Sequence, residues 1–230
     1  MLSQPFLTRF LSICLLALAV FLGGCGKDKG IDDVTADELY TRAKNAMDAS
    51  SWDRSIGLYK ALQTRYPFGR YTEQSMLDLS YVYFRRGATE EALSTLDRFI
   101  RTYPTHPSVD YAYYLKGLVN YEQNLGFLEK MMPSRVSDRD QSQAENAFFD
   151  FQELIRRYPD SRYVPAARQR MVFLRNSLAA YEVIVAEYYL RREAYIAAAN
   201  RARFAIEVYP HTPSIPAALT VMHQAYMELE

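Results

Sequence analysis

A Tyr-Pro pair recurs four times along the chain, and it constrains the fold more than any other feature of the sequence. The prolines stand at positions 67, 104, 159 and 210. Because proline disfavours the helical conformation in the residue before it, each pair predicts the end of a helix. The segments before these pairs are rich in Ala, Leu, Glu and Arg, which favour helix. We therefore expect four helices that end in the same way.

The residues upstream of each proline also repeat. A small residue stands twelve positions before it, and mostly larger apolar residues stand eight and five positions before it. This spacing places all three on one face of a helix. The positions hold Ser55, Ala92, Ala147 and Ala198; Tyr59, Leu96, Phe151 and Ala202; and Leu62, Phe99, Leu154 and Ala205. A second helical segment precedes each of these helices, so the repeating unit is a helix pair.

The helix pairs resemble the tetratricopeptide (TPR) repeat. The second copy fits the pattern most fully, with Leu79, Ser80, Tyr83, Gly87, Ala92, Leu96, Phe99 and Pro104 in register. A helix pair cannot bury both of its faces alone, so successive pairs must stack. We expect an all-α solenoid of about five helix pairs. Their ranges are 36–69, 70–106, 107–160, 161–212 and an incomplete 213–230.

Three parts of this solenoid leave alternatives open. The third pair is interrupted by an insertion at 124–141, much longer than a TPR turn. Its apolar residues either cap the core of the solenoid or contact a partner; they are Phe127, Leu128, Met131 and Met132. Residues 165–192 predict one long helix, or two that meet near Asn176. The segment from 213 is either a capping helix or the first half of a further pair.

The N-terminus predicts export and lipidation. Residues 10–22 form an apolar run that is too short to cross a bilayer but suits the core of a signal peptide. The run ends in "LGGC", which resembles a bacterial lipobox. That resemblance implies removal of a signal peptide (1–24), a lipid such as palmitate on Cys25 and a lipidated, flexible leash at 25–35. The residue after the cysteine is Gly26 and not Asp, which favours the outer membrane. The alternative is an ordinary signal peptide with an incidental cysteine.

The remaining composition argues against an enzyme. The 27 basic and 27 acidic residues balance, so no charge excess indicates nucleic acid. His106, His211 and His223 lack the spacing of metal ligands, and we expect no cofactor other than the lipid on Cys25. No phosphate-binding loop or nucleophile motif is found. Asp138 and Asp140 surround Arg139, which favours a solvated, self-neutralising loop over a catalytic pair.

Several short sequence segments fall outside the general TPR pattern. They are "RYPFG", "DRFIR", "SDRD", "VFLRN" and "VAEYY". Together with the lipobox and the helix pairs, they resemble the BamD family of lipoproteins. That family belongs to the machinery that assembles β-barrel proteins in the Gram-negative outer membrane. The resemblance implies a non-enzymatic scaffold at the periplasmic face of the outer membrane, alongside other lipoproteins of the same complex.

The resemblance also implies two binding regions. The C-terminal repeats would hold the periplasmic POTRA region of the barrel subunit BamA, with contacts at Tyr188, Tyr189 and Arg201. The N-terminal repeats would receive the targeting segment of unfolded barrel proteins in an apolar pocket edged by Tyr66 and Phe68. Considered without the resemblance, Arg201 is more simply a solvated surface residue.

Two other classes of protein fit the general features. One is a different TPR lipoprotein scaffold, such as a pilotin-like factor for secretin assembly. The other is an envelope enzyme with a TPR anchor, which would need a second domain for which the chain has no room. The segments outside the TPR pattern argue against the first alternative.

Overall fold

The computed structural model describes residues 34–129 and 141–230, and the side chains of 123–129 lie outside this description. The described ranges contain nine α-helices and no strand. The helices are α2 (Ala36–Asp48), α3 (Trp52–Arg65), α4 (Arg70–Arg86), α5 (Thr89–Thr102), α6 (Val109–Glu129), α7 (Ser142–Arg157), α8 (Val164–Arg191), α9 (Tyr195–Val208) and α10 (Ile215–Met227).

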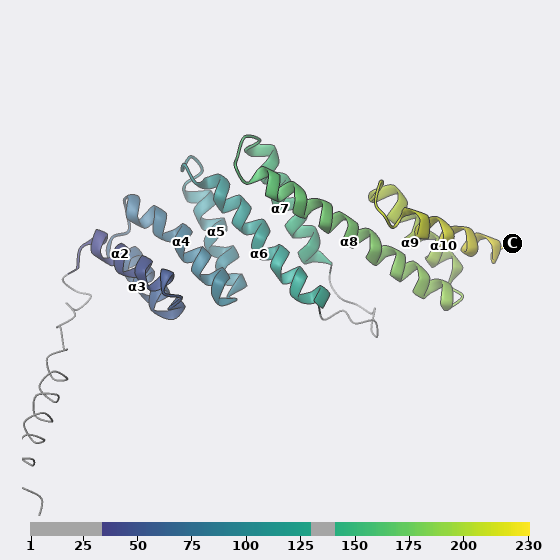
Figure 1. Cartoon of the computed structure of the whole chain (residues 1–230), viewed down its shortest axis with the longest axis horizontal. Coiled ribbons are helices and arrows are strands. Elements are labelled where there is room, and N and C mark those ends of the chain that lie inside the picture. The colour runs from purple at the N-terminus through teal and green to yellow at the C-terminus, as the bar shows by residue number, and fades with distance from the viewer. Residues whose placement is uncertain (1–33, 130–140) are drawn as a thin grey trace, which may run out of the picture.

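The helices follow one another along an elongated row in chain order (Figure 1). They form the pairs α2/α3, α4/α5, α6/α7 and α8/α9, and the described chain ends with α10 packed against α9 and α8. The expected all-α solenoid of TPR helix pairs is therefore confirmed. In the described residues it comprises four complete pairs and one single terminal helix.

The repeated positions before each Tyr-Pro form the core of the stack. Each of the twelve residues at these positions has an exposed fraction of 0%. The small residue of each triplet lets the preceding helix approach closely, as at Ser55, whose hydroxyl donates to the carbonyl of Ala43 at 3.0 Å. This bond joins α3 to α2 within a dry interface. The sequence periodicity thus identified the packing face of every second helix.

The four Tyr-Pro pairs end their helices with one geometry. The amide of each tyrosine donates to the carbonyl four residues earlier, at 2.8 Å for Tyr66, Tyr103 and Tyr158 and at 3.1 Å for Tyr209. The tyrosines then leave the helical conformation, with φ between −118° and −131° and positive ψ. The following proline has no amide hydrogen, so the hydrogen-bond ladder stops there.

Polar groups, most of them partly buried, join successive pairs of the stack. Asp78 on α4 accepts hydrogen bonds from the hydroxyls of Tyr40 on α2 and Tyr59 on α3, at 2.8 and 3.2 Å. Burial, and then the charge of Asp78, raise the pKa of both tyrosines, which therefore stay protonated as donors. Lys116 on α6 lies 2.9 Å from Asp97 on α5 and 3.4 Å from Asp150 on α7.

Two helix boundaries resolve or correct expectations from the sequence. Residues 164–191 form one continuous helix, α8, with no break near Asn176. The insertion was expected to begin at 124, but α6 continues to Glu129. The predictions at Cys25, Met131, Met132, Asp138 and Asp140 concern positions outside the described residues.

The contact between α6 and α7 predicts a large effect from one methyl group. A Cβ atom added at Gly117 would lie 2.6 Å from the ring of Phe151, which is fully buried. We expect Gly117→Ala to lower the free energy of unfolding by about 1–3 kcal/mol through overpacking. The measurement is urea denaturation followed by circular dichroism.

Gly57 provides the matched control, because it is exposed on α3 and nothing lies within 4 Å of an added Cβ. Gly57→Ala should raise the free energy of unfolding by about 0.5–1 kcal/mol through helix propensity. Equal effects of the two substitutions would contradict the close approach of α6 and α7.

Candidate functional site

The "RYPFGRY" stretch forms the turn between α3 and α4. The Tyr66 hydroxyl donates to the carbonyl of Val34 at 3.0 Å, and the Tyr66 ring packs against the N-terminal core. Gly69 has φ +107°, a conformation that L side chains rarely adopt. Its carbonyl accepts the amides of Thr72 and Glu73 and so begins α4. Phe68, at the tip of the turn, is 88% exposed.

The two residues expected at the edge of a binding pocket therefore differ in role. Tyr66 is half-buried, and its hydroxyl ties the turn to the residue before α2. Phe68 contributes little to the packing of the chain, because most of its surface faces solvent. An exposed aromatic ring on a turn held by a glycine and a half-buried tyrosine is available to contact another molecule.

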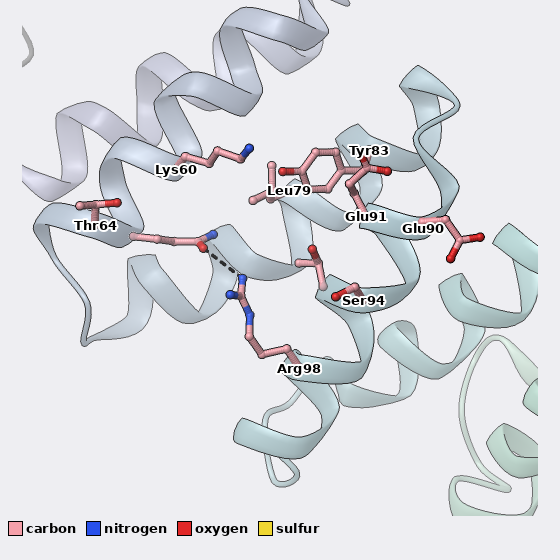
Figure 2. Close-up of a pocket in the computed structure, with 10 residues that line it drawn as sticks. Lys60, Thr64, Leu79, Tyr83, Glu90, Glu91, Ser94 and Arg98 are labelled. Carbon is pink, nitrogen blue, oxygen red and sulfur yellow. Dashed lines mark hydrogen bonds between the residues drawn. The ribbon is translucent and has the colours of Figure 1, made fainter.

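A hollow on the described surface lies beside this turn, between α3, α4 and α5 (Figure 2). Its volume is about 680 Å³. The lining residues are mainly polar or charged: Lys60, Gln63, Thr64, Leu79, Tyr83, Glu90, Glu91, Ser94, Thr95 and Arg98. Figure 2 shows Arg98 on α5 reaching toward α3, where its Nη2 donates to Gln63 Oε1 at 3.5 Å.

This hollow differs from the apolar pocket that the sequence predicted. It carries charges of both signs, and neither Tyr66 nor Phe68 lines it, because the Tyr66 ring turns toward the start of α2. Polar walls of this kind suit the backbone amides and carbonyls of an extended peptide. A sequence signal was available: Lys60, Gln63 and Thr64 follow helical spacing on the side of α3 away from its core positions.

The three residues predicted to contact a partner come together near the end of α8 and on α9. Tyr189 and Arg201 line one shallow hollow of about 350 Å³, together with Ala197, Asn200 and Phe204. The rings of Tyr188 and Tyr189 meet edge to face, with centroids 5.7 Å apart. Tyr188 is 38% exposed, whereas Tyr189 packs partly against the C-terminal core.

Arg201 is not simply solvated, which corrects the plainer expectation from the sequence. Its Nη1 donates to both carboxylate oxygens of Glu182 on α8, at 3.0 and 3.3 Å. Glu182 is buried, while about half of the Arg201 side chain remains accessible. Because Glu182 lies nineteen positions earlier on another helix, sequence spacing contained no signal for this pair.

An apolar groove of about 330 Å³ adjoins this surface and was not anticipated from the sequence. It lies between α7, α8 and α9, and Phe204 lines both it and the Arg201 hollow. Its other lining residues are Glu145, Phe148, Phe149, Arg175, Leu178, Val208 and Tyr209. Burial, and then the charges of Glu145 and Glu182, raise the pKa of the Tyr209 hydroxyl.

Within residues 34–129 and 141–230, no group of three or more His, Cys, Asp or Glu side chains is arranged to hold a metal ion. The helices of the same ranges include none that is both long enough and apolar enough to span a bilayer.

Comparison with known proteins decides the family. The model of the family described as "YfiO: Outer membrane lipoprotein" matches residues 32–230. The outer membrane protein assembly factor BamD of Xylella fastidiosa (strain Temecula1) is 41% identical over 94% of this chain and 74% of that protein. The chain belongs to the BamD (YfiO) family. The resemblance inferred from the lipobox, the helix pairs and the segments outside the TPR pattern is therefore confirmed.

Other BamD relatives match with similar strength. BamD of Neisseria meningitidis serogroup B is 39% identical over 97% of this chain and 84% of that protein. BamD of Vibrio cholerae is 38% identical over 94% of this chain and 89% of that protein. Among solved structures, MamA matches with a TM-score of 0.39 and 15% identity, over 84% of this chain and 82% of the other.

The different roles of Tyr66 and Phe68 in this BamD-family chain can be measured. Tyr66→Phe removes the hydrogen bond to Val34 and leaves its carbonyl without that donor, so the free energy of unfolding should fall by about 1 kcal/mol. Phe68→Ala should change it by less than about 0.5 kcal/mol, since the ring is exposed. Thermal and urea unfolding of both variants test this. A large loss of stability in Phe68→Ala would contradict its assignment as a free contact residue.

Proposed function

We propose that the chain is a non-enzymatic assembly factor for outer membrane proteins. The observation that carries the proposal is its 38–41% identity to relatives named outer membrane protein assembly factor BamD, over nearly its whole length. An assembly factor acts by binding and positioning other proteins, in agreement with the expectation that the chain is not an enzyme. An elongated solenoid offers separate surfaces for this purpose at its two ends.

The proposed place of action is the periplasmic face of the outer membrane, with attachment through a lipid on Cys25. The lipobox sequence supports the lipidation site, and the family description of an outer membrane lipoprotein supports the compartment. Each buried methylene of an acyl chain contributes about 0.8 kcal/mol, so more than one chain gives lasting attachment.

The proposed C-terminal partner is the POTRA region of a BamA-type barrel subunit, bound at Tyr188, Tyr189 and Arg201. The exposed Tyr188 and half-exposed Arg201 are residue types that frequently dominate binding energy at protein interfaces. The guanidinium of Arg201 is suited to a charge-assisted hydrogen bond with an acidic partner residue. The adjoining groove at Phe204 offers apolar surface beside this charge.

The proposed substrate surface is formed by the N-terminal repeats. The polar hollow between α3 and α5 would receive the backbone of an extended targeting segment from an unfolded barrel protein. Phe68 would contact an aromatic or aliphatic side chain of that segment outside the hollow, since its ring is the most exposed large apolar group described nearby. Tyr66 would hold the turn in place for this contact.

The C-terminal proposal predicts the effect of removing one guanidinium. Arg201→Ala should weaken binding of the purified POTRA region of the cognate BamA-type subunit by about tenfold or more, because the partner carboxylate loses its donor. Alanine is preferable to glutamate at position 201, where a second carboxylate would face Glu182. Binding is measured by calorimetry or biolayer interferometry.

Arg203→Ala is the matched control, because Arg203 is exposed on the same helix and hydrogen-bonds only locally, to Asn200. This variant should bind the POTRA region as the unmodified protein does. Unchanged binding by Arg201→Ala would refute the contact. Recovery of a secretin and no BamA-type subunit in a pull-down from envelopes would instead favour the pilotin-like alternative.

The N-terminal proposal predicts a local contact at Phe68. A photo-reactive residue at position 68 should cross-link to a peptide copied from the C-terminal segment of an unfolded barrel protein. Phe68→Ser should weaken the binding of that peptide about three- to tenfold, as expected for the loss of one aromatic contact. Val172 on α8 is half-exposed and serves as the control for both modifications. Equal cross-linking from positions 68 and 172 would contradict a specific site.

A further inference from the structure

Glu182 is an acidic residue in an apolar setting. It is 8% exposed, and the neighbouring core residues of α8 include Ala179, Val183 and Ala186. Burial of a carboxylate is unfavourable unless hydrogen bonds or an opposite charge compensate for the lost hydration. A hydrophobic residue would fill such a position more simply, so the charge calls for an explanation.

The geometry of the ion pair indicates what this carboxylate does. Both oxygens of Glu182 accept from the same nitrogen of Arg201, Nη1, at 3.0 and 3.3 Å. The hydrogen bond to Glu182 raises the pKa of the guanidinium, which stays charged throughout the physiological range. A guanidinium has five N–H donors in one plane, so the donors on Nη2 and Nε point along other edges of the group.

The two residues differ sharply in exposure. Glu182 is held within the core side of α8, whereas 47% of the Arg201 side chain is accessible, in the hollow lined by Tyr189 and Phe204. Glu182 therefore holds one nitrogen of the guanidinium, while about half of the Arg201 side chain remains accessible to a partner. Binding that orders a long arginine side chain loses conformational entropy. An intramolecular ion pair orders the side chain before the partner binds, so this loss does not occur on association.

We propose that Glu182 is a positioning residue, which holds the Arg201 guanidinium so that its outer edge meets a carboxylate of the protein partner. The inference rests on the proposed C-terminal partner contact and adds a residue to it. The partner carboxylate binds along the Nη2/Nε edge, opposite the edge taken by Glu182. An arginine between two carboxylates satisfies both, because each uses different donors of one planar group.

Two other roles for Glu182 make different predictions. If its carboxylate merely competed with the partner for Arg201, removing its charge would strengthen binding. If the pair served only the stability of α8 against α9, removing the charge would alter unfolding and leave binding unchanged. The direction of the change in affinity therefore separates positioning from competition and from a purely structural role.

The experiment compares four forms of the full chain: unmodified, Glu182→Gln, Arg201→Ala and the double variant. The probe is the purified POTRA region of the cognate BamA-type subunit. We expect Glu182→Gln to weaken binding about five- to tenfold, as for one side chain that must now be ordered on association. In the double variant we expect no loss beyond that of Arg201→Ala, since the two residues act through one contact.

Asp150→Asn is the matched control, because Asp150 is a half-buried carboxylate that is likewise in an ion pair, with Lys116 at 3.4 Å, but lies on α7. It should leave binding unchanged. Circular dichroism verifies the fold of each variant, and Glu182→Met, which fills the same space without charge, replaces Glu182→Gln if that protein does not fold.

A second readout does not need the partner. Nitrogen-detected NMR of the arginine side chains should show slow rotation of the Arg201 guanidinium in the unmodified chain and faster rotation in Glu182→Gln. Equal rotation in both, or unchanged or tighter partner binding by Glu182→Gln, would overturn the positioning role. If Arg201→Ala itself binds normally, the proposed partner contact is wrong, and the role of Glu182 in it is wrong as well.

Discussion

The contact of helix against helix at a small residue, repeated once in every pair, is the constraint on which the rest of the structure depends. Ser55, Ala92, Ala147 and Ala198 are fully buried and permit the close approach of the preceding helix. In α3, α5 and α7 the larger residues one and two turns later are fully buried as well. Because no pair can bury both faces alone, the folding of each depends on its neighbours, and the elongated row in Figure 1 follows.

This arrangement also explains why the two ends of the solenoid have different surfaces. In the N-terminal half the core positions hold large residues such as Tyr59 and Phe99, and polar side chains cover the outside. On α9 the core positions before the Tyr-Pro pair are all alanine, and several of its larger apolar residues face outward. Ile196, Phe204 and Val208 are 67%, 43% and 47% exposed. The same repeat thus leaves a polar hollow at one end and an aromatic, arginine-bearing surface at the other.

The candidate sites were predictable only in part. The family resemblance drew attention to Phe68, Tyr188, Tyr189 and Arg201, and the last two indeed line one hollow. The polar hollow was missed because its residues come from three helices whose mutual orientation is set by packing. The pairing of Arg201 with Glu182 was missed for the same reason. Tyr66 was interpreted as a contact residue, whereas its hydroxyl lies against the chain at Val34.

The sequence by itself determined the helix pairs, the buried face of every second helix and the four helix ends at Tyr-Pro, since these depend on local rules. A proline beyond the first turn interrupts the helical hydrogen bonds, and a helical period places residues on one face regardless of the rest of the chain. Only the tertiary structure decided which side chains from different helices meet. The shared acceptor at Asp78, the hollow between α3 and α5, and the buried Glu182 beneath Arg201 all arise between helices. The distance and rotation between two packed helices depend on every side chain in their interface, and no local pattern contains that information.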